Sequence, residues 1–363
     1  MLRALPVLVI ICLIALLCAC SGGNPQHTAY ATLPSSNAVA GFYVDDHNGT
    51  FTPMPKSPYT GGSGPASVVV HPSNKFVYAS NAVENTISLF TADSRSGALT
   101  EALPRTPTGA QPLHLAMTSD GSLLFCSNTS GNNISVYSVN SSTGVLTQAP
   151  GSPVTTFSPS SLLVSRSGST LYVANSNSSR ISAFTYSSSG VLTPVAGSPF
   201  AAGADPSGLA TDPNGKFLYA ANLDDTTFSG FTIGSGGVLT PMSGSPFELT
   251  LGTTNVSIST PVSMVVDLSG KYLYAVVVNP LNIYGYTIDP NTGLPAMITG
   301  SPFASSGTGP GCAVADTKGE FIYVCDQTSN SIALFDIDIS SGALTTPSAT
   351  STITGPTSLF VTP

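Results

Sequence analysis

The sequence contains no tryptophan and few charged residues. Of its 363 residues only 8% are charged, with 10 Lys and Arg against 18 Asp and Glu and a net charge of −8. No basic stripe of the kind that binds phosphate backbones is present, so no nucleic acid partner is expected. After the first 20 residues, no apolar pattern with a helical period extends beyond a few positions, which argues against a helical fold.

Cysteine is also scarce. Three of the six cysteines lie in the first 20 residues, and Cys126, Cys312 and Cys325 remain. None of these three has the spacing of a zinc site. Cys312 and Cys325 flank a Lys-Gly turn at 318–319 almost symmetrically, so they form either a cross-strand disulfide, which an exported protein permits, or two buried thiols.

The N-terminal segment has the pattern of an export signal. One cation, Arg3, precedes an uninterrupted apolar run from residue 4 to residue 19. This run is shorter than the roughly 20 residues that span a bilayer and fits the apolar core of a signal peptide. An ordinary secretory signal explains this part of the pattern equally well.

The end of the apolar run favours a more specific interpretation. Leu17-Cys18-Ala19-Cys20 resembles the bacterial lipobox, and a polar, glycine-containing segment follows it. The resemblance implies a lipoprotein signal peptide over residues 1–19, a lipidated tether over 20–27 and lipidation at Cys20. We therefore expect an exported protein that is lipid-anchored in the bacterial cell envelope, with the membrane as a partner through its lipid.

Seven prolines divide the rest of the chain into repeats. Their spacings are 47, 47, 47, 55, 49 and 46 residues, which is typical of a repeat architecture rather than of two domains. Each proline opens two β-rich runs around a turn containing Gly or Asn, followed by a polar loop. The prolines are Pro65, Pro112, Pro159, Pro206, Pro261, Pro310 and Pro356.

Each repeat has the length and turn signals of one four-stranded antiparallel blade. Three strands, around Tyr30, Phe42 and Phe51, precede the first repeat, and a single strand over residues 358–361 follows the last proline. Three strands and one strand together complete a blade and hide the edges of the ring. The sequence thus predicts an all-β, seven-bladed β-propeller over residues 28–363, closed by the C-terminal strand and monomeric.

The repeats resemble a known family. Residues 204–222, ADPSGLATDPNGKFLYAAN, are similar to repeats of the lactonase-type (6-phosphogluconolactonase-like) seven-bladed propellers and of the related propellers named for a Tyr-Val-Thr-Asn repeat. The segments GVLTP (190–194) and GSPF (197–200) are similar as well. The resemblance extends from about residue 28 to the C-terminus. In the lactonase family an inner strand carries Pro-Arg-His, and arginine, histidine and glutamate around the central funnel are implicated in opening the lactone.

The residues just after the prolines are predicted to line the mouth of the central channel. We expect ligand contacts from Ser67, His114, Ser161, Ser207, Ser263, Thr357 and Ser358. His114 alone matches the family histidine, and Leu113 occupies the arginine position. His114 is the candidate general base because the pKa of histidine lies near neutrality. The alternative is a polar residue that lines a wet channel without catalysing anything.

A second polar group lies on the same side of the predicted ring. Asp205, Asp224 and Asp225 are a weak candidate for a calcium site, although loop aspartates more often cap turns. No cofactor is expected. The long spacing after Pro206 comes from an insertion at residues 248–259, which we expect at the mouth side of the ring.

Two functions compete at this point. The leading interpretation is a non-catalytic binding or scaffold module for a neutral glycan or an envelope protein. The alternative is a lactonase, similar to 6-phosphogluconolactonase, that uses His114 as general base. The second needs a cation near the substrate, and the sequence offers none at the mouth. The position of Arg105 and Arg180 relative to the mouth is the observation that separates the two.

Overall fold

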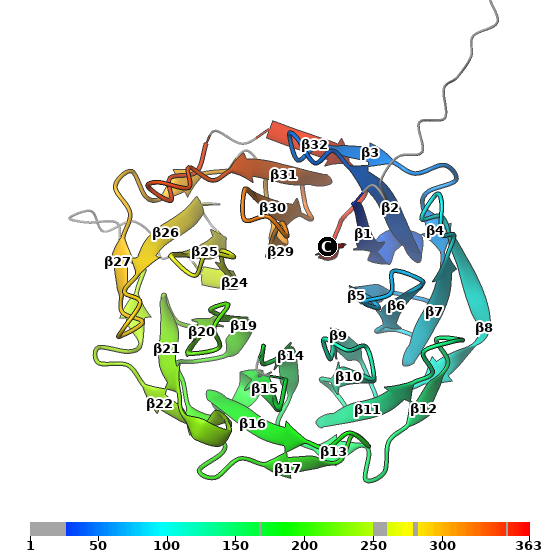
Figure 1. Ribbon diagram of the computed structural model, residues 1–363, viewed down its shortest axis with the longest axis horizontal. Coiled ribbons are helices and arrows are strands. Elements are labelled where there is room, and N and C mark those ends of the chain that lie inside the picture. Colours follow the sequence, from blue (N-terminus) through cyan, green and yellow to red (C-terminus); the bar gives the residue numbers. More distant parts are fainter. Residues whose placement is uncertain (1–26, 167, 250–259, 279–281, 306, 346–347) are drawn as a thin grey trace, which may run out of the picture.

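The protein is a ring of seven antiparallel sheets around one axis (Figure 1). The computed structural model describes residues 27–166, 168–249, 260–278, 282–305, 307–345 and 348–363. The predicted all-β, seven-bladed propeller is confirmed. Its described residues include no α-helix, only three single 3₁₀ turns: η1 (Pro34–Ser36), η2 (Ser176–Ser178) and η3 (Ser235–Gly237).

We number the blades from the first proline and name the last one the closing blade. Blade 1 contains β5 (Pro65–Val70), β6 (Phe76–Asn81), β7 (Thr86–Ala92) and β8 (Leu99–Pro107). Blade 2 contains β9 (Pro112–Met117), β10 (Leu123–Asn128), β11 (Asn133–Val139), β12 (Leu146–Gln148) and β13 (Val154–Thr155). Blade 3 contains β14 (Pro159–Val164), β15 (Thr170–Asn175), β16 (Arg180–Tyr186), β17 (Leu192–Pro194) and β18 (Phe200–Ala201).

The second half of the ring repeats this order. Blade 4 contains β19 (Pro206–Thr211), β20 (Phe217–Asn222), β21 (Thr227–Ile233), β22 (Leu239–Pro241) and β23 (Phe247–Glu248). Blade 5 contains β24 (Thr260–Val266), β25 (Tyr272–Val278), β26 (Asn282–Ile288), β27 (Pro295–Met297) and β28 (Phe303–Ala304). Blade 6 contains β29 (Pro310–Ala315), β30 (Phe321–Asp326), β31 (Ser331–Asp336) and β32 (Ser348–Thr352).

The closing blade joins the two ends of the chain. It contains β1 (Thr28–Leu33), β2 (Ala38–Val44), β3 (Phe51–Pro53), β4 (Tyr59–Thr60) and the innermost strand β33 (Ser358–Val361). β33 pairs antiparallel with β1, with Tyr30 opposite Phe360. The main-chain N–H of Thr28 donates to Oγ1 of Thr362 at 2.9 Å. The predicted closure by three strands and one strand is confirmed.

A short fifth strand, which the sequence interpretation did not foresee, follows the outer strand in five blades. It pairs with the third strand of its own sheet after a Ser-Pro step with a cis peptide bond. The serine hydroxyl of this step accepts a hydrogen bond from a third-strand N–H at 2.9–3.0 Å, as for Ser57, Ser152, Ser198, Ser245 and Ser301. The repeated Gly-Ser-Pro-Phe segments therefore have a structural role. Blades 1 and 6 have four strands in their described residues.

The core lies between the blades. Each seam holds a cluster of buried apolar side chains from the facing surfaces of two sheets, which is why many strands are apolar on both faces. A tyrosine in the second strand also donates to a glycine carbonyl of the following blade: Tyr78 Oη lies 2.7 Å from the Gly144 oxygen. Burial raises the pKa of the equivalent Tyr172 to about 12, so its hydroxyl keeps its proton. Phe125 occupies this position in blade 2 and makes no such bond.

The antiparallel order places two kinds of loop at one end of the ring. Loops between second and third strands, and connections from one blade to the next proline, share the end at which the innermost strands begin; we name it the top face. Turns between first and second strands lie at the opposite end, the bottom face. Within the described residues, no helix is long and apolar enough to cross a membrane.

Blade 6 contains a disulfide. Cys312 on β29 lies directly opposite Cys325 on β30, with a Cα–Cα distance of 5.1 Å, and the two sulfurs are bonded. Cys126 is a buried thiol, and burial raises its pKa to about 12. This thiol is therefore not a nucleophile at ordinary pH.

Candidate functional site

The mouth of the ring is built from the starts of the innermost strands on the top face. Proline has no N–H to give to a ladder, and in most blades the pairing register shifts just after it, as between Pro65 and Ser67 and between Pro310 and Cys312. This bulge leaves one residue without a partner on the neighbouring strand. The side chains after it therefore do not follow the strict alternation between the two faces of the sheet.

Several of the predicted mouth serines point into the seams between blades. Ser67 Oγ accepts from the Leu115 N–H at 3.1 Å, and Ser263 Oγ accepts from the Ala313 N–H at 3.3 Å. Ser358 Oγ bonds the Val68 N–H in the same way at 3.3 Å. Ser67 is almost completely buried. These three hydroxyls join neighbouring blades, so their geometry favours a structural use.

The other predicted hydroxyls do not form an open surface at the axis either. Ser161 is buried, and Thr357 Oγ1 lies 2.9 Å from Thr32 Oγ1 in the closing blade. Ser207 Oγ is inaccessible to water and has no partner in the described part of the chain. The structure therefore gathers the predicted serines and threonine around the axis, but it does not present them together as an open binding surface.

His114 occupies the same place on β9 and is partly exposed. Its Nδ1 faces the Leu162 N–H of blade 3 at 3.4 Å, which makes Nδ1 the acceptor and places the proton on Nε2. No described residue bonds Nε2. Burial lowers the pKa of His114 to about 4, so the ring is neutral at ordinary pH. In this tautomer the available atom is a hydrogen-bond donor rather than a base.

The described innermost strands bring no charged side chain to His114. The seven innermost strands, as described, contain no Asp, Glu, Lys or Arg. Arg180 is exposed at the start of β16, the third strand from the axis. His47 and His71 lie in bottom-face turns, at the opposite end of the ring.

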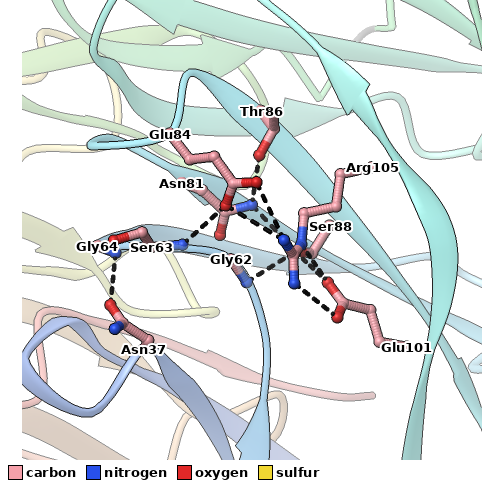
Figure 2. A network of polar contacts seen from close by, with 10 residues as sticks. All are labelled: Asn37, Gly62, Ser63, Gly64, Asn81, Glu84, Thr86, Ser88, Glu101 and Arg105. Carbon is pink, nitrogen blue, oxygen red and sulfur yellow. Dashed lines mark hydrogen bonds and ion pairs between the residues drawn. The ribbon is translucent and has the colours of Figure 1, made fainter.

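Arg105 is engaged elsewhere. It lies on the outermost strand β8, where Figure 2 shows it between two glutamates. Nε donates to Glu101 Oε1 at 2.8 Å and Nη2 to Glu101 Oε2 at 3.0 Å. Nη1 donates to Glu84 Oε1 at 3.0 Å. Two carboxylates compensate this guanidinium, so Arg105 supplies no cation to the mouth.

The acidic candidate does not gather into a metal site. Among the described residues no group of three or more His, Cys, Asp or Glu side chains is arranged to hold a metal ion. Asp225 Oδ2 accepts from the Ala204 N–H at 2.6 Å, which is a loop-capping contact. Burial, and secondarily the charge of Asp224, raises the pKa of Asp205.

A shallow recess lies on the bottom face, where the closing blade meets blade 6. His27, Asp46 and Lys318 line it, and His27 Nδ1 lies 2.9 Å from Asp46 Oδ1. Lys318 Nζ donates to the main-chain oxygen of Asp46 at 3.1 Å. These contacts join the N-terminal and C-terminal parts of the ring across the closing seam. Cys20, the predicted signal segment and residues 250–259 of the insertion lie outside the described residues.

Fold and site together define a closed seven-bladed propeller whose described innermost strands carry no charged residue and hold one neutral histidine. A family model described as "Lactonase, 7-bladed beta-propeller" matches residues 24–157, 148–247 and 263–361. The chain belongs to this lactonase propeller family. No curated protein matches the sequence.

Solved structures share the fold. A proposed 6-phosphogluconolactonase from Bacteroides fragilis superposes with a TM-score of 0.79 at 20% identity, covering 94% of this chain and 99% of that one. The periplasmic gluconolactonase PpgL of Pseudomonas aeruginosa gives 0.77 at 16% identity, covering 93% and 99%. Hydrazine synthase from Kuenenia stuttgartiensis gives 0.63 at 16%, covering 85% and 95%. At these identities the likeness concerns the fold and leaves the activity open.

Proposed function

We propose that this propeller hydrolyses an uncharged sugar lactone at its axial mouth. The observation that carries the proposal is His114, a neutral side chain at the mouth whose Nε2–H has no partner among the described residues. The family match over most of the chain supports lactone chemistry. The gluconolactonase among the structures with the same fold is consistent with an unphosphorylated substrate.

The proposed role of His114 differs from the base expected from the sequence. A neutral Nε2–H donates to the lactone carbonyl oxygen, where negative charge develops as water adds to the carbonyl carbon. The ring C–O bond then breaks, one proton of the attacking water ends on the ring oxygen, which leaves as a hydroxyl, and the carboxylic acid that forms releases the other proton. Because the Nδ1 lone pair is directed at the Leu162 N–H, His114 holds its proton at Nε2 throughout the reaction.

The absence of charge in the described innermost strands limits the substrate. A phosphate or carboxylate is normally held by arginine or lysine, and the described inner strands contain neither. A neutral polyol ring needs only hydrogen bonds. The proposal is therefore restricted to lactones without a phosphate.

A second candidate is a binding module without turnover, for a neutral glycan or an envelope protein. The low pKa of His114 favours it, because this histidine is a poor base at neutral pH. Export and lipid attachment at Cys20 stay predictions from the sequence and apply to both candidates.

The test follows hydrolysis of glucono-lactone and its 6-phosphate by proton release at constant pH, against the spontaneous rate. We expect turnover of the neutral lactone, a loss of about 10²–10³-fold in His114→Ala, and partial retention in His114→Gln, which keeps an N–H donor. His47→Ala, exposed on the bottom face, is the matched control and leaves the rate unchanged. Folding of each variant is checked by circular dichroism.

The pH profile excludes a general base with an ordinary histidine pKa, and His114→Gln separates a donor from a base whose pKa is about 4, because glutamine offers an N–H but no basic nitrogen. A donor whose pKa is about 4 gives a constant rate from pH 8 down to about pH 5, after correction for the spontaneous reaction. A general base with an ordinary histidine pKa gives a rate that falls below pH 6.5. Binding of lactone without turnover would establish the second candidate, and a preference for the phosphorylated lactone would contradict both the substrate and the uncharged site.

A further inference from the structure

A buried asparagine ends the second strand in four blades. Its side-chain amide is hydrogen-bonded to a serine hydroxyl on the third strand, seven residues later. The pairs are Asn81 with Ser88 at 3.0 Å, Asn128 with Ser135 at 2.9 Å, Asn175 with Ser182 at 2.8 Å and Asn222 with Ser229 at 3.2 Å. In blade 1 the Gly62 N–H also donates to Ser88 Oγ, at 3.2 Å (Figure 2). This arrangement gives the side-chain N–H of Asn81 an acceptor, while Asn81 Oδ1 has no partner among the described residues.

Blade 6 changes both members of the pair. Asp326 replaces the asparagine and Ala333 replaces the serine. Asp326 is completely buried, and neither of its carboxyl oxygens has a hydrogen-bond partner in the described part of the chain. The connection at Gly307 packs directly against this carboxyl group, because a Cβ at Gly307 would collide with Asp326 Oδ2.

The neighbouring elements bring no opposite charge. β29 and the connection 307–309 contain no charged residue, and β31 contains only Asp336, at its far end opposite Phe321. In blade 5, β25 and β26 offer tyrosines as their only titratable groups. Burial alone raises the pKa of Asp326 to about 7. The carboxyl is therefore neutral in acid, and in its ionised form it is a buried, unpaired charge.

We propose that Asp326 is a pH-sensitive latch that holds the top of blade 6 closed in acid and loosens it at neutral and higher pH. β30 ends at Asp326, which pairs with Pro310 at the mouth. Beyond it, the Gln327 N–H donates to the Gly309 oxygen at 2.8 Å and the Thr328 N–H to the Thr308 oxygen at 3.1 Å. Opening these two bonds lets the carboxylate reach water. The latch acts on the shape of the mouth and does not depend on the proposed hydrolysis.

The direction of the effect follows from proton linkage. Between the ordinary pKa of an aspartate, about 3.9, and the folded-state value of about 7, the folded protein binds a proton that the unfolded chain has released. The folded state is therefore most stable, as far as this group is concerned, in acid. Across this window the folding equilibrium constant falls by up to tenfold per pH unit, and above the window the group causes no further change.

The experiment compares the wild type with Asp326→Asn and with Asp326→Asn/Ala333→Ser, which recreates the pair of the other blades. Unfolding midpoints are measured from pH 4 to pH 8. We expect Asp326→Asn to gain on the wild type as the pH rises to 7, and the double variant to be more stable than the single one at every pH. Asp289→Asn, at an exposed turn, is the control and shows no such gain between pH 6 and pH 8.

Amide hydrogen exchange tests the latch itself. After correction for intrinsic pH dependence, Gln327 and Thr328 lose protection as the pH rises from 5 to 8. The equivalent amides of blade 1, Ala82 and Val83, bond to the Gly64 and Ser63 oxygens and stay constant. Asp326→Asn abolishes the difference. Parallel stability curves for wild type and Asp326→Asn, or unchanged protection of Gln327 across this range, would overturn the proposal.

Discussion

Blades 1 and 6 stand on either side of the closing blade and share one design, yet they treat the same buried position in opposite ways. Both have four described strands, and both enter their first strand through a Gly-x-Gly-Pro connection. In blade 1, Asn81 and Ser88 begin a polar network that runs outward to Glu101, Arg105 and Glu84 (Figure 2). In blade 6 the position holds Asp326 without a partner.

Blade 1 places three of the protein's few charged side chains in one network. Ser88 Oγ donates to Glu101 Oε1 at 2.7 Å, so the network of blade 1 connects the side-chain N–H of Asn81 to a partly exposed ion pair, although Asn81 Oδ1 has no partner among the described residues. Arg105 serves this network and not the mouth. Blade 6 offers its buried Asp326 no such partner, and burial favours the neutral acid at this position.

The largest effect should come from filling the glycine that faces this position. A Cβ at Gly62 collides with the Asn81 side chain, which Thr86 and Ser88 hold in place. Gly62→Ala is expected to cost about 3 kcal/mol of unfolding free energy, measured by urea denaturation. Gly203→Ala, which faces Asn222, serves as the matched case and should cost as much.

The corresponding change in blade 6 sharpens the contrast. Gly307→Ala meets Asp326 more closely: the added Cβ would lie 2.6 Å from Asp326 Cβ, which rotation of the side chain does not move, so the cost should be at least as large as in blade 1 although no hydrogen bond holds the carboxyl group. A clearly smaller cost for Gly307→Ala would mean that the polar network of Asn81, and not close packing, sets the rigidity of the position.

A smaller effect is expected from removing the serine that blade 6 lacks. Ser88→Ala leaves the Asn81 amide and the Gly62 N–H without their shared acceptor, at a cost of about 2 kcal/mol. Chemical denaturation at pH 7 measures it. The reverse change alone, Ala333→Ser in the wild type, gives Asp326 a donor and should stabilise blade 6. If Ser88→Ala does not change the free energy of unfolding, the Asn81 amide finds another partner. The two blades would then not differ in the way described.

The repeat length and the turn signals were enough to predict the blades and their closure, because each strand is short, apolar and bounded by Gly, Pro or Asn. The mouth could not be predicted in the same way. Their positions just after the strand-opening prolines placed Ser67 and Ser263 at the mouth, but the bulge after Pro65 and Pro261 directs their hydroxyls to the next blade. Register shifts depend on local hydrogen bonding that composition does not reveal.

The electrostatic features were equally hidden. The sequence indicated that His114 is alone at the mouth, but its tautomer depends on the Leu162 N–H of another blade. The unpaired state of Asp326 follows from Ala333, seven residues away on a different strand. Contacts across strands and seams decide these pKa values, and they require coordinates.

The smallest predicted effect concerns the outer end of the blade 1 network. Glu84 is partly exposed, and the Ser63 N–H, followed by Arg105, lowers its pKa. Because water and salt screen this carboxylate, Glu84→Gln should cost only about 0.5 kcal/mol at neutral pH and low salt.

The pH and salt dependence of the stability lost in Glu84→Gln shows whether the loss is electrostatic. A lowered carboxyl pKa stabilises the fold above the unfolded value of about 4.3, so the difference between Glu84→Gln and wild type should shrink as the pH falls below it. It should also shrink in 1 M salt. Glu101→Gln is the matched comparison: Glu101 is less exposed and meets Arg105 through both oxygens, so its loss should be larger and less sensitive to salt. If salt reduces the loss of unfolding free energy equally in both variants, the two ion pairs of Arg105 do not differ in their exposure to solvent. Blades 1 and 6 would then differ only at the position of Asn81 and Asp326.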